Sequence, residues 1–188
     1  MSQPRILVLA ASLRGGSLNR RLAELFARRV TEQGGQATLP DLRDYAMPLY
    51  DGDIEQNEGI PATAKALHQV FAGHQGIFIA SPEYNSALSP LLVNILSWVS
   101  RVKDNGGQGA AFGTPVYALG SASPGGFGGY RGLVALRGVL ELGLGARVLP
   151  QMVSVPAAHQ AFDEAGELTT PAGAMVGTLA GQLLKAVG

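Results

Sequence analysis

The chain has 188 residues, which is enough for one hydrophobic core and favours a single domain over residues 1–188. Charged residues make up only 15% of the sequence against 46% apolar residues, which suggests that another copy of the chain covers part of the surface. Basic and acidic residues are equal at 14 each, so no net field would attract nucleic acid or anionic lipid, and neither partner is expected.

The absence of cysteine excludes disulfides, thiolate metal sites and cysteine nucleophiles, so redox chemistry would need a cofactor. The apolar run near the amino end, Ile6 to Ala11, is short and has no cleavage region after it. No apolar stretch approaches about 18 residues, the length that a membrane-spanning helix needs. These features predict a cytoplasmic protein that does not enter a membrane.

The first part of the chain alternates a buried strand with a helix. Arg5 to Ala11 is an apolar run without alternation, which is typical of a strand buried on both faces in a parallel sheet. Apolar residues then recur at helical spacing from Leu18 to Val30, until Gly34 and Gly35 end the helix. A weaker strand is predicted from Gln36 to Leu42.

The middle of the chain repeats this alternation after a long loop. Tyr45 to Ile60 is an acidic loop of a length that more often has a function than not. Pro61 opens a helix, and Gly76 to Ser81 is a second buried strand. Ser89 is a helix cap, and the helix after it runs from Pro90 to about Val102.

The last part of the chain completes the pattern. The strand Pro115 to Ser121 is followed by a glycine-rich loop, Ser121 to Gly129. A leucine stripe from Leu133 to Leu144 indicates a helix, and Arg147 to Val155 is the last strand. The segment from Thr170 to Val187 is a helix capped by its first two residues. Five alternations of strand and helix predict an α/β domain whose parallel sheet is covered on both faces.

The loop after the first strand has the composition of a phosphate site. Two hydroxyls, a guanidinium and an amide precede or open a helix, whose free N–H groups and dipole favour an anion; these come from Ser12, Ser17, Arg14 and Asn19. The patterns GxxxxGK[ST] and GxGxxG are absent, which favours a single terminal phosphate over a triphosphate or a dinucleotide. The alternative is that Ser17 only caps the helix and Arg14 is a surface charge.

Two later loops end at the same edge of the predicted sheet, where ligands of open parallel sheets bind. Pro82 to Asn85 offers an aromatic ring, a carboxylate and backbone amides that could contact a flat heterocycle. Ser121 to Gly129 is rich in glycine, which lets a backbone lie flat against a ligand. N–H donors at this edge would stabilise the negative charge of a reduced flavin. The alternatives are a turn on which Tyr84 merely packs and a glycine-rich tip without a ligand.

Taken together, these loops resemble those of the NADPH-dependent FMN reductases, a family that includes quinone, chromate and azo-dye reductases. The first loop is similar to the family's GS[LT]RxxSxN motif, with Ala11 in place of the glycine. Pro82 to Asn85 matches its PEYN motif, and Ser123 to Arg131 is similar to its SPGxxGGxR loop. Met47 to Asp53 also resembles the family's loop after the second strand. The resemblance covers nearly the whole chain.

The resemblance implies a flavodoxin-like sheet of order 2-1-3-4-5, FMN as cofactor, NADPH or NADH as electron donor, and a homodimer or homotetramer. The FMN phosphate would lie on the first loop and the ring against the other two, with Tyr84 as the catalytic residue that orients the reactants. No metal site is expected. The residues expected to bind the cofactor are Ser12, Arg14, Ser17, Leu18, Asn19, Pro82, Glu83, Tyr84, Asn85, Ser121, Ser123, Pro124, Gly125 and Gly126.

The predicted function is an FMN-dependent NAD(P)H oxidoreductase that reduces small acceptors such as quinones, free flavin, chromate or azo compounds in two half-reactions. A flavodoxin-like electron-transfer or redox-sensing module without small-molecule turnover stays open, although its electron-carrier form would favour an acidic surface and this chain is neutral. A third alternative is an α/β protein that binds another phosphorylated ligand.

The histidines His68, His74 and His159 lack the spacing of metal ligands, so they are expected to be ordinary core or surface residues. Hydrolysis is not favoured, because no nucleophile elbow is present. The helix from Pro90 to Val102 is apolar nearly all round, which predicts burial on both sides. We expect the sheet on one side and a second subunit on the other, with Val99 facing that subunit across a two-fold interface.

Overall fold

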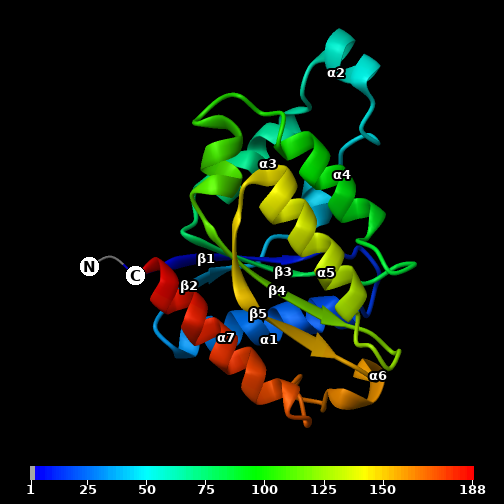
Figure 1. Cartoon of the computed structure of the whole chain (residues 1–188), viewed down its shortest axis with the longest axis vertical. Coiled ribbons are helices and arrows are strands. Elements are labelled where there is room, and N and C mark those ends of the chain that lie inside the picture. Colours follow the sequence, from blue (N-terminus) through cyan, green and yellow to red (C-terminus); the bar gives the residue numbers. More distant parts are fainter. Residues whose placement is uncertain (1–2) are drawn as a thin grey trace.

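Five parallel strands form one sheet in the order β2-β1-β3-β4-β5 (Figure 1), which confirms the predicted α/β class and strand order. The computed structural model describes residues 3–188. Strand β3 is buried along its whole length, and β1 along all but its first residue, as their continuous apolar runs predict. The strands are β1 (Arg5–Ala10), β2 (Gln36–Thr38), β3 (Gly76–Ala80), β4 (Val116–Ala122) and β5 (Arg147–Val155).

Helices cover both faces of this sheet (Figure 1), so that two apolar cores form, one on each face. In the first core the rings of Phe26 and Phe78 stack with their centroids 3.7 Å apart. No helix in residues 3–188 has both the length and the apolar character that a membrane crossing requires. The helices are α1 (Leu18–Glu32) and α7 (Ala172–Val187) on one face, and α3 (Ala62–Ala72), α4 (Pro90–Val99) and α5 (Tyr130–Gly138) on the other. Two segments are π-helical. The first, η2 (Gly109–Gly113), precedes β4, and the second, η3 (Val139–Gly143), continues α5.

The segment between β2 and α3 differs from its prediction. Strand β2 ends at Thr38 and not at Leu42, because Pro40 has no N–H to continue the ladder. A short 3₁₀ helix, η1 (Leu42–Tyr45), follows, and the Asp41 carboxylate caps it by accepting from the Arg43 amide at 2.9 Å. The predicted loop also contains a helix, α2 (Gly52–Glu58), which projects from the body of the molecule (Figure 1). None of its residues is buried, so it has no apolar periodicity to detect.

Two helix caps were predicted, and they have different outcomes. The Ser89 cap is confirmed, because its Oγ accepts from the Leu92 amide at 3.2 Å. The Thr170 cap is wrong. Pro171 is the residue that precedes α7. Within the described residues 3–188, no side chain caps this helix and the buried Thr170 hydroxyl has no hydrogen-bond partner. Only the Thr170 carbonyl oxygen contributes, by accepting from the Gly173 amide at 2.9 Å.

The prediction that α4 needs a second subunit on its outer side is corrected in part, because the chain's own residues 48–55 cover much of that side. The Trp98 indole and the Asn94 amide both donate to the Pro48 carbonyl oxygen at 2.9 Å. Arg101 lies 3.8 Å over the Tyr50 ring. Val99, which was assigned to the outer side, is fully buried.

Candidate active site

Loop 1 (residues 11–17) joins β1 to α1 and leaves the free amides at the start of α1 open to an anion. The buried Ser17 caps this helix, with its Oγ accepting from the Arg20 amide at 3.3 Å. Gly16 has φ +67, a backbone conformation that favours glycine. The exposed Arg14 side chain makes no hydrogen bond within residues 3–188, so a guanidinium stands free at the mouth of this turn.

Asn19 connects loop 1 to the end of β4. Its side chain is almost fully buried, and its Nδ2 donates to the Ala122 carbonyl oxygen at 3.0 Å. Its Oδ1 accepts from the Ala122 amide, also at 3.0 Å. The asparagine therefore holds the first turn of α1 against the third loop of the site, which is a structural role beside the predicted contact with a cofactor.

Loop 2 (residues 81–89) carries a tight turn at its tip. Tyr84 and Ala87 exchange two backbone hydrogen bonds of 3.1 and 3.0 Å, and the two residues between them, Asn85 and Ser86, have φ 52 and 63. The Ser89 hydroxyl donates to the Ala11 carbonyl oxygen at 2.9 Å and so fixes loop 2 to loop 1. The Tyr84 side chain is half exposed and free to meet a ligand.

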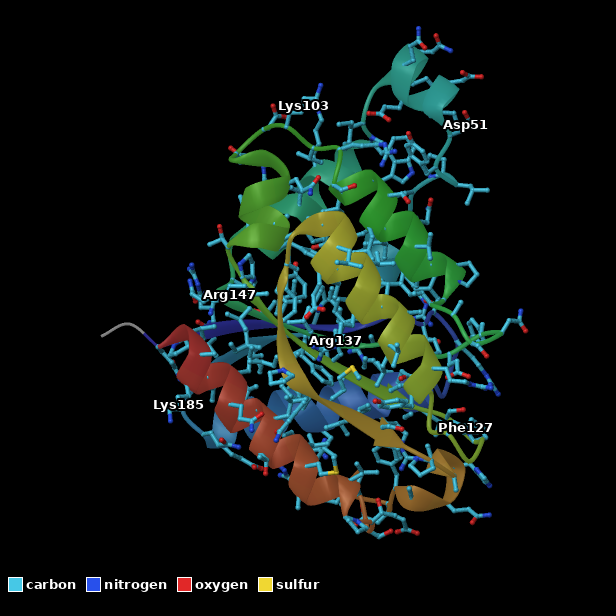
Figure 2. The ribbon with its side chains drawn as sticks, viewed as in Figure 1. Asp51, Lys103, Phe127, Arg137, Arg147 and Lys185 are labelled. Atoms are coloured by element: carbon cyan, nitrogen blue, oxygen red, sulfur yellow. The ribbon has the colours of Figure 1, made fainter. Side chains whose placement is uncertain are left out.

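Loop 3 (residues 123–129) leads into α5 and is pressed against loop 2. Gly129 has φ +85, and a Cβ there would lie 1.9 Å from the Ser121 Oγ. Figure 2 shows Phe127 at the end of the molecule where α6 (Ala158–Ala161) also lies. The Ala158 amide donates to the Ser123 carbonyl oxygen at 3.0 Å, so α6 supports loop 3 from behind.

Glu83 joins loop 2 to the first turn of α5, directly after loop 3, through its carboxylate. The Arg131 Nε donates to Glu83 Oε1 at 2.9 Å, and the Gly132 amide donates to Oε2 at 3.1 Å. Burial would by itself raise the pKa of the Glu83 carboxyl, but these hydrogen bonds outweigh burial and hold its pKa below the ordinary value. Glu83 is therefore expected to be ionised at neutral pH.

The three loops enclose one cavity of about 300 Å³ at the carboxyl edge of the sheet. One end is formed by the cap and amides of loop 1 and the other by backbone and side chains of loops 2 and 3, which suits a ligand with a phosphate at one end and a flat ring at the other. Its lining residues are Ser12, Arg14, Gly16, Ser17, Leu18, Asn19, Pro82, Glu83, Tyr84, Ala122, Ser123, Pro124 and His159.

A second cavity of about 440 Å³ adjoins the first on the other side of loop 1. It shares Arg14 and Ser17 with the first cavity and is lined further by Arg20, Arg21 and Arg43. Acidic partners offset much of this charge, since Arg20 pairs with Glu24 and Arg43 with Asp41. Within residues 3–188, no group of three or more His, Asp or Glu side chains could hold a metal ion.

Comparison with known proteins agrees with this geometry. Residues 4–160 match the protein family described as NADPH-dependent FMN reductase. The chain belongs to this family. As the sequence predicts, it is an FMN-dependent oxidoreductase that uses NAD(P)H.

Proteins similar to this chain have names that fit the family. A quinone reductase of Escherichia coli (strain K12) is 35% identical over 136 residues, which are 72% of this chain and 69% of that protein. An NAD(P)H-dependent FMN reductase of Pseudomonas aeruginosa is 32% identical over 165 residues, which are 87% of this chain and 84% of that protein. The solved structure of the flavoenzyme FerB, an NAD(P)H:acceptor oxidoreductase from Paracoccus denitrificans, has the same fold, with a TM-score of 0.76 at 19% identity over 98% of this chain and 99% of that chain.

The structure brings most of the predicted site residues into the first cavity. Four of them do not line it. Asn85 lies at the exposed tip of loop 2, Ser121 is fully buried behind loop 3, and Gly125 and Gly126 lie exposed on loop 3 outside the lining. A direct contact of these four with the cofactor stays a prediction.

His159 lines the cavity, and the sequence did not indicate it. Its lack of metal-ligand spacing led to its interpretation as an ordinary residue. It follows closely on the carboxyl end of β5, and the rule that ligands lie beyond the carboxyl ends of parallel strands could have placed it at the site. Ala122 was missed for a simpler reason, because alanine has no polar group to mark it.

Proposed function

We propose that the first cavity is the FMN site, with the cofactor phosphate on loop 1 and the flavin ring between loops 2 and 3. The observation that carries this proposal is that one cavity joins an open helix amino-terminus to two loops tied together beside it. The free Arg14 guanidinium and the α1 amides would bind the phosphate by charge-assisted hydrogen bonds. The backbone of loops 2 and 3 would hold the ring.

When bound, FMN would supply the redox chemistry that links NAD(P)H to an acceptor. The protein contributes orientation and electrostatics. Tyr84 stands half exposed beside the cavity, so it is placed to align the donor or the acceptor with the ring. The two hydrogen bonds between Tyr84 and Ala87 restrict the backbone of Tyr84, which supports its role in aligning the reactants.

We infer that the acceptors are small oxidised molecules such as quinones, and that the donor is NADPH or NADH. Relatives named as quinone reductases support the acceptor class. A reaction that draws on NAD(P)H also supports a cytoplasmic location, which cell fractionation would test.

A spectrum and an activity assay test this proposal together. The purified protein should absorb as a flavoprotein, release FMN and not FAD on heating, and oxidise NADPH or NADH with a quinone, ferricyanide or free FMN as acceptor. FAD in the supernatant would contradict the cofactor, as would failure to bind added FMN. Bound FMN without turnover of any acceptor would favour the electron-transfer alternative.

The assembly is a separate part of the proposal, namely that two or four copies associate through the surface between α4 and η3. Val93 and Val139 are 48% and 40% exposed, and both line this surface. A groove of about 190 Å³ lies between these elements. Because α4 follows loop 2, a second copy on this surface would lie near the acceptor.

Sedimentation tests the assembly. The wild type should sediment as a dimer or tetramer at micromolar concentration, and Val139→Glu should shift it towards the monomer by placing a charge in the interface. Leu49→Glu is a matched control, since Leu49 is 79% exposed and lies outside this surface. A monomeric wild type with full activity would contradict the proposal.

A further inference from the structure

Glu83 belongs to loop 2, and its carboxylate contacts Arg131 and Gly132 at the start of α5. Its side chain is only 8% exposed, whereas the side chain of its partner Arg131 is 53% exposed. Arg131 also lies 4.7 Å over the Phe127 ring at the tip of loop 3. One buried acid is thus paired with one base that reaches the surface.

Helix α5 depends on this acid because it has no cap of its own. Its cap position is Gly129, which has no side chain to offer, so the Gly132 amide would otherwise lack a partner near the start of the helix. Glu83 supplies the acceptor from a residue 49 positions away in the sequence. A carboxylate at a helix amino-terminus is also favoured by the helix dipole.

The contact between loop 2 and α5 leaves no room for a side chain at Gly132. A Cβ on Gly132 would lie 3.1 Å from both the Glu83 Cβ and the Ala87 carbonyl oxygen. Loop 2 and the first turn of α5 therefore touch through backbone. The Glu83 carboxylate and this backbone contact together hold loop 2 at a fixed distance from α5.

Glu83 also lines the cavity itself, so its charge acts on whatever binds there. Arg131 does not line the cavity, but its guanidinium pairs with the carboxylate and so compensates that charge. The pair is close to neutral as seen from the cavity, and removal of either member would leave a net charge beside the ring.

We propose that Glu83 and Arg131 form a positioning pair that fixes loops 2 and 3 around the flavin and sets its two-electron reduction potential through their compensating charges. This inference rests on the proposed placement of FMN. The reduced cofactor carries more negative charge than the oxidised one, so an uncompensated carboxylate disfavours reduction and an uncompensated guanidinium favours it.

The test is the reduction potential of bound FMN in four proteins, measured at about pH 8 by equilibration with redox dyes. Arg131→Gln should lower the potential and Glu83→Gln should raise it. Each shift should be near a tenfold change in the ratio of affinities for oxidised and reduced FMN, which is about 30 mV for a two-electron couple. The double variant should return close to the wild-type value.

Opposite signs are the decisive result, because a merely structural role would disturb both variants in the same direction or leave the potential unchanged. Either of those outcomes would overturn the proposal. Arg131→Lys retains the charge and should keep the potential near that of the wild type; a shift as large as that of Arg131→Gln would also count against charge compensation.

Arg131 is half exposed, so its variants should fold even if Glu83→Gln does not. In that case the comparison decides: Arg131→Gln should lower the potential, and Arg131→Lys should not. Failure of the wild type to bind FMN would overturn the proposed function and this inference together. A wild type that binds FMN, with potentials unmoved in the variants, would overturn only the role of the pair.

Discussion

Loop 1 and the junction of loops 2 and 3 form two ends of one cavity, but they are built in different ways. Loop 1 is local: its cap, its turn and its free guanidinium come from Ser17, Gly16 and Arg14 within a few positions of each other. The junction is long-range, because Glu83 completes a helix that begins far along the chain. Ser17 caps its own helix, whereas Glu83 caps another one.

The difference indicates how each end responds to change. A local turn tolerates substitutions that do not touch its few polar contacts, because little else is packed against it. A junction of two loops depends on the fit between distant backbones, so small additions at the contact affect the whole fold.

Replacing a glycine by alanine should reduce stability very differently at the two ends of the cavity. Gly129→Ala should lower the free energy of unfolding by about 3 kcal/mol or more, because its φ of +85 disfavours alanine and the new Cβ would clash with Ser121 Oγ. Gly15→Ala meets no atom within 4 Å, and the expected loss is under about 0.5 kcal/mol. Chemical denaturation measures both, and equal losses would contradict the contrast.

Arg14→Ala should affect binding and not folding. We expect FMN affinity to fall about ten- to a hundredfold through loss of one charge-assisted contact of about 1.5 to 3 kcal/mol. Titration of the apoprotein with FMN measures the loss, and riboflavin, which lacks the phosphate, is the control ligand and should bind both proteins alike. Wild-type FMN affinity in the variant would show that Arg14 is only a surface charge.

Removal of a single hydroxyl should also have different effects on stability at the two serine caps, Ser89 and Ser17. Ser89→Ala should cost about 2 kcal/mol, because its buried hydroxyl both caps α4 and donates to the Ala11 carbonyl oxygen of loop 1. Ser17→Ala removes a cap alone and should cost about 1 kcal/mol. Urea midpoints give the order, and a larger loss for Ser17→Ala would reverse the interpretation.

The pH dependence of stability should show the smallest effect. The pKa of Glu83 is lower in the folded state than its ordinary value of about 4.3, so the unfolded state takes up a proton first as the pH falls. The stabilisation is complete above that value and is lost as the pH drops through the folded-state pKa. Unfolding free energies between about pH 6 and pH 3 should therefore fall less steeply for Glu83→Gln than for the wild type. Parallel profiles would contradict this assignment.

Much of the fold and one end of the site could be predicted from the sequence by itself. The apolar runs of β1 and β3, the helical periodicities and the Ser89 cap are local signals, because each records how the immediate backbone is buried or capped. Loop 1, the proposed phosphate site, belongs to the same class. Its residues lie within one turn and the helix after it, so the sequence alone shows that their polar groups are close together.

Only the tertiary structure decided which segments of the chain contact each other. Periodicity showed that the helix after Ser89 is apolar on most sides, but not that the chain's own Pro48 and Tyr50 cover one of them or that Val99 is buried. Helix α2 gave no signal because nothing in it is buried. The place of His159 in the cavity and the cap that Glu83 provides depend on segments far apart in sequence coming together. A linear pattern records the burial of a residue but not the identity of its neighbours, and those neighbours are fixed by packing.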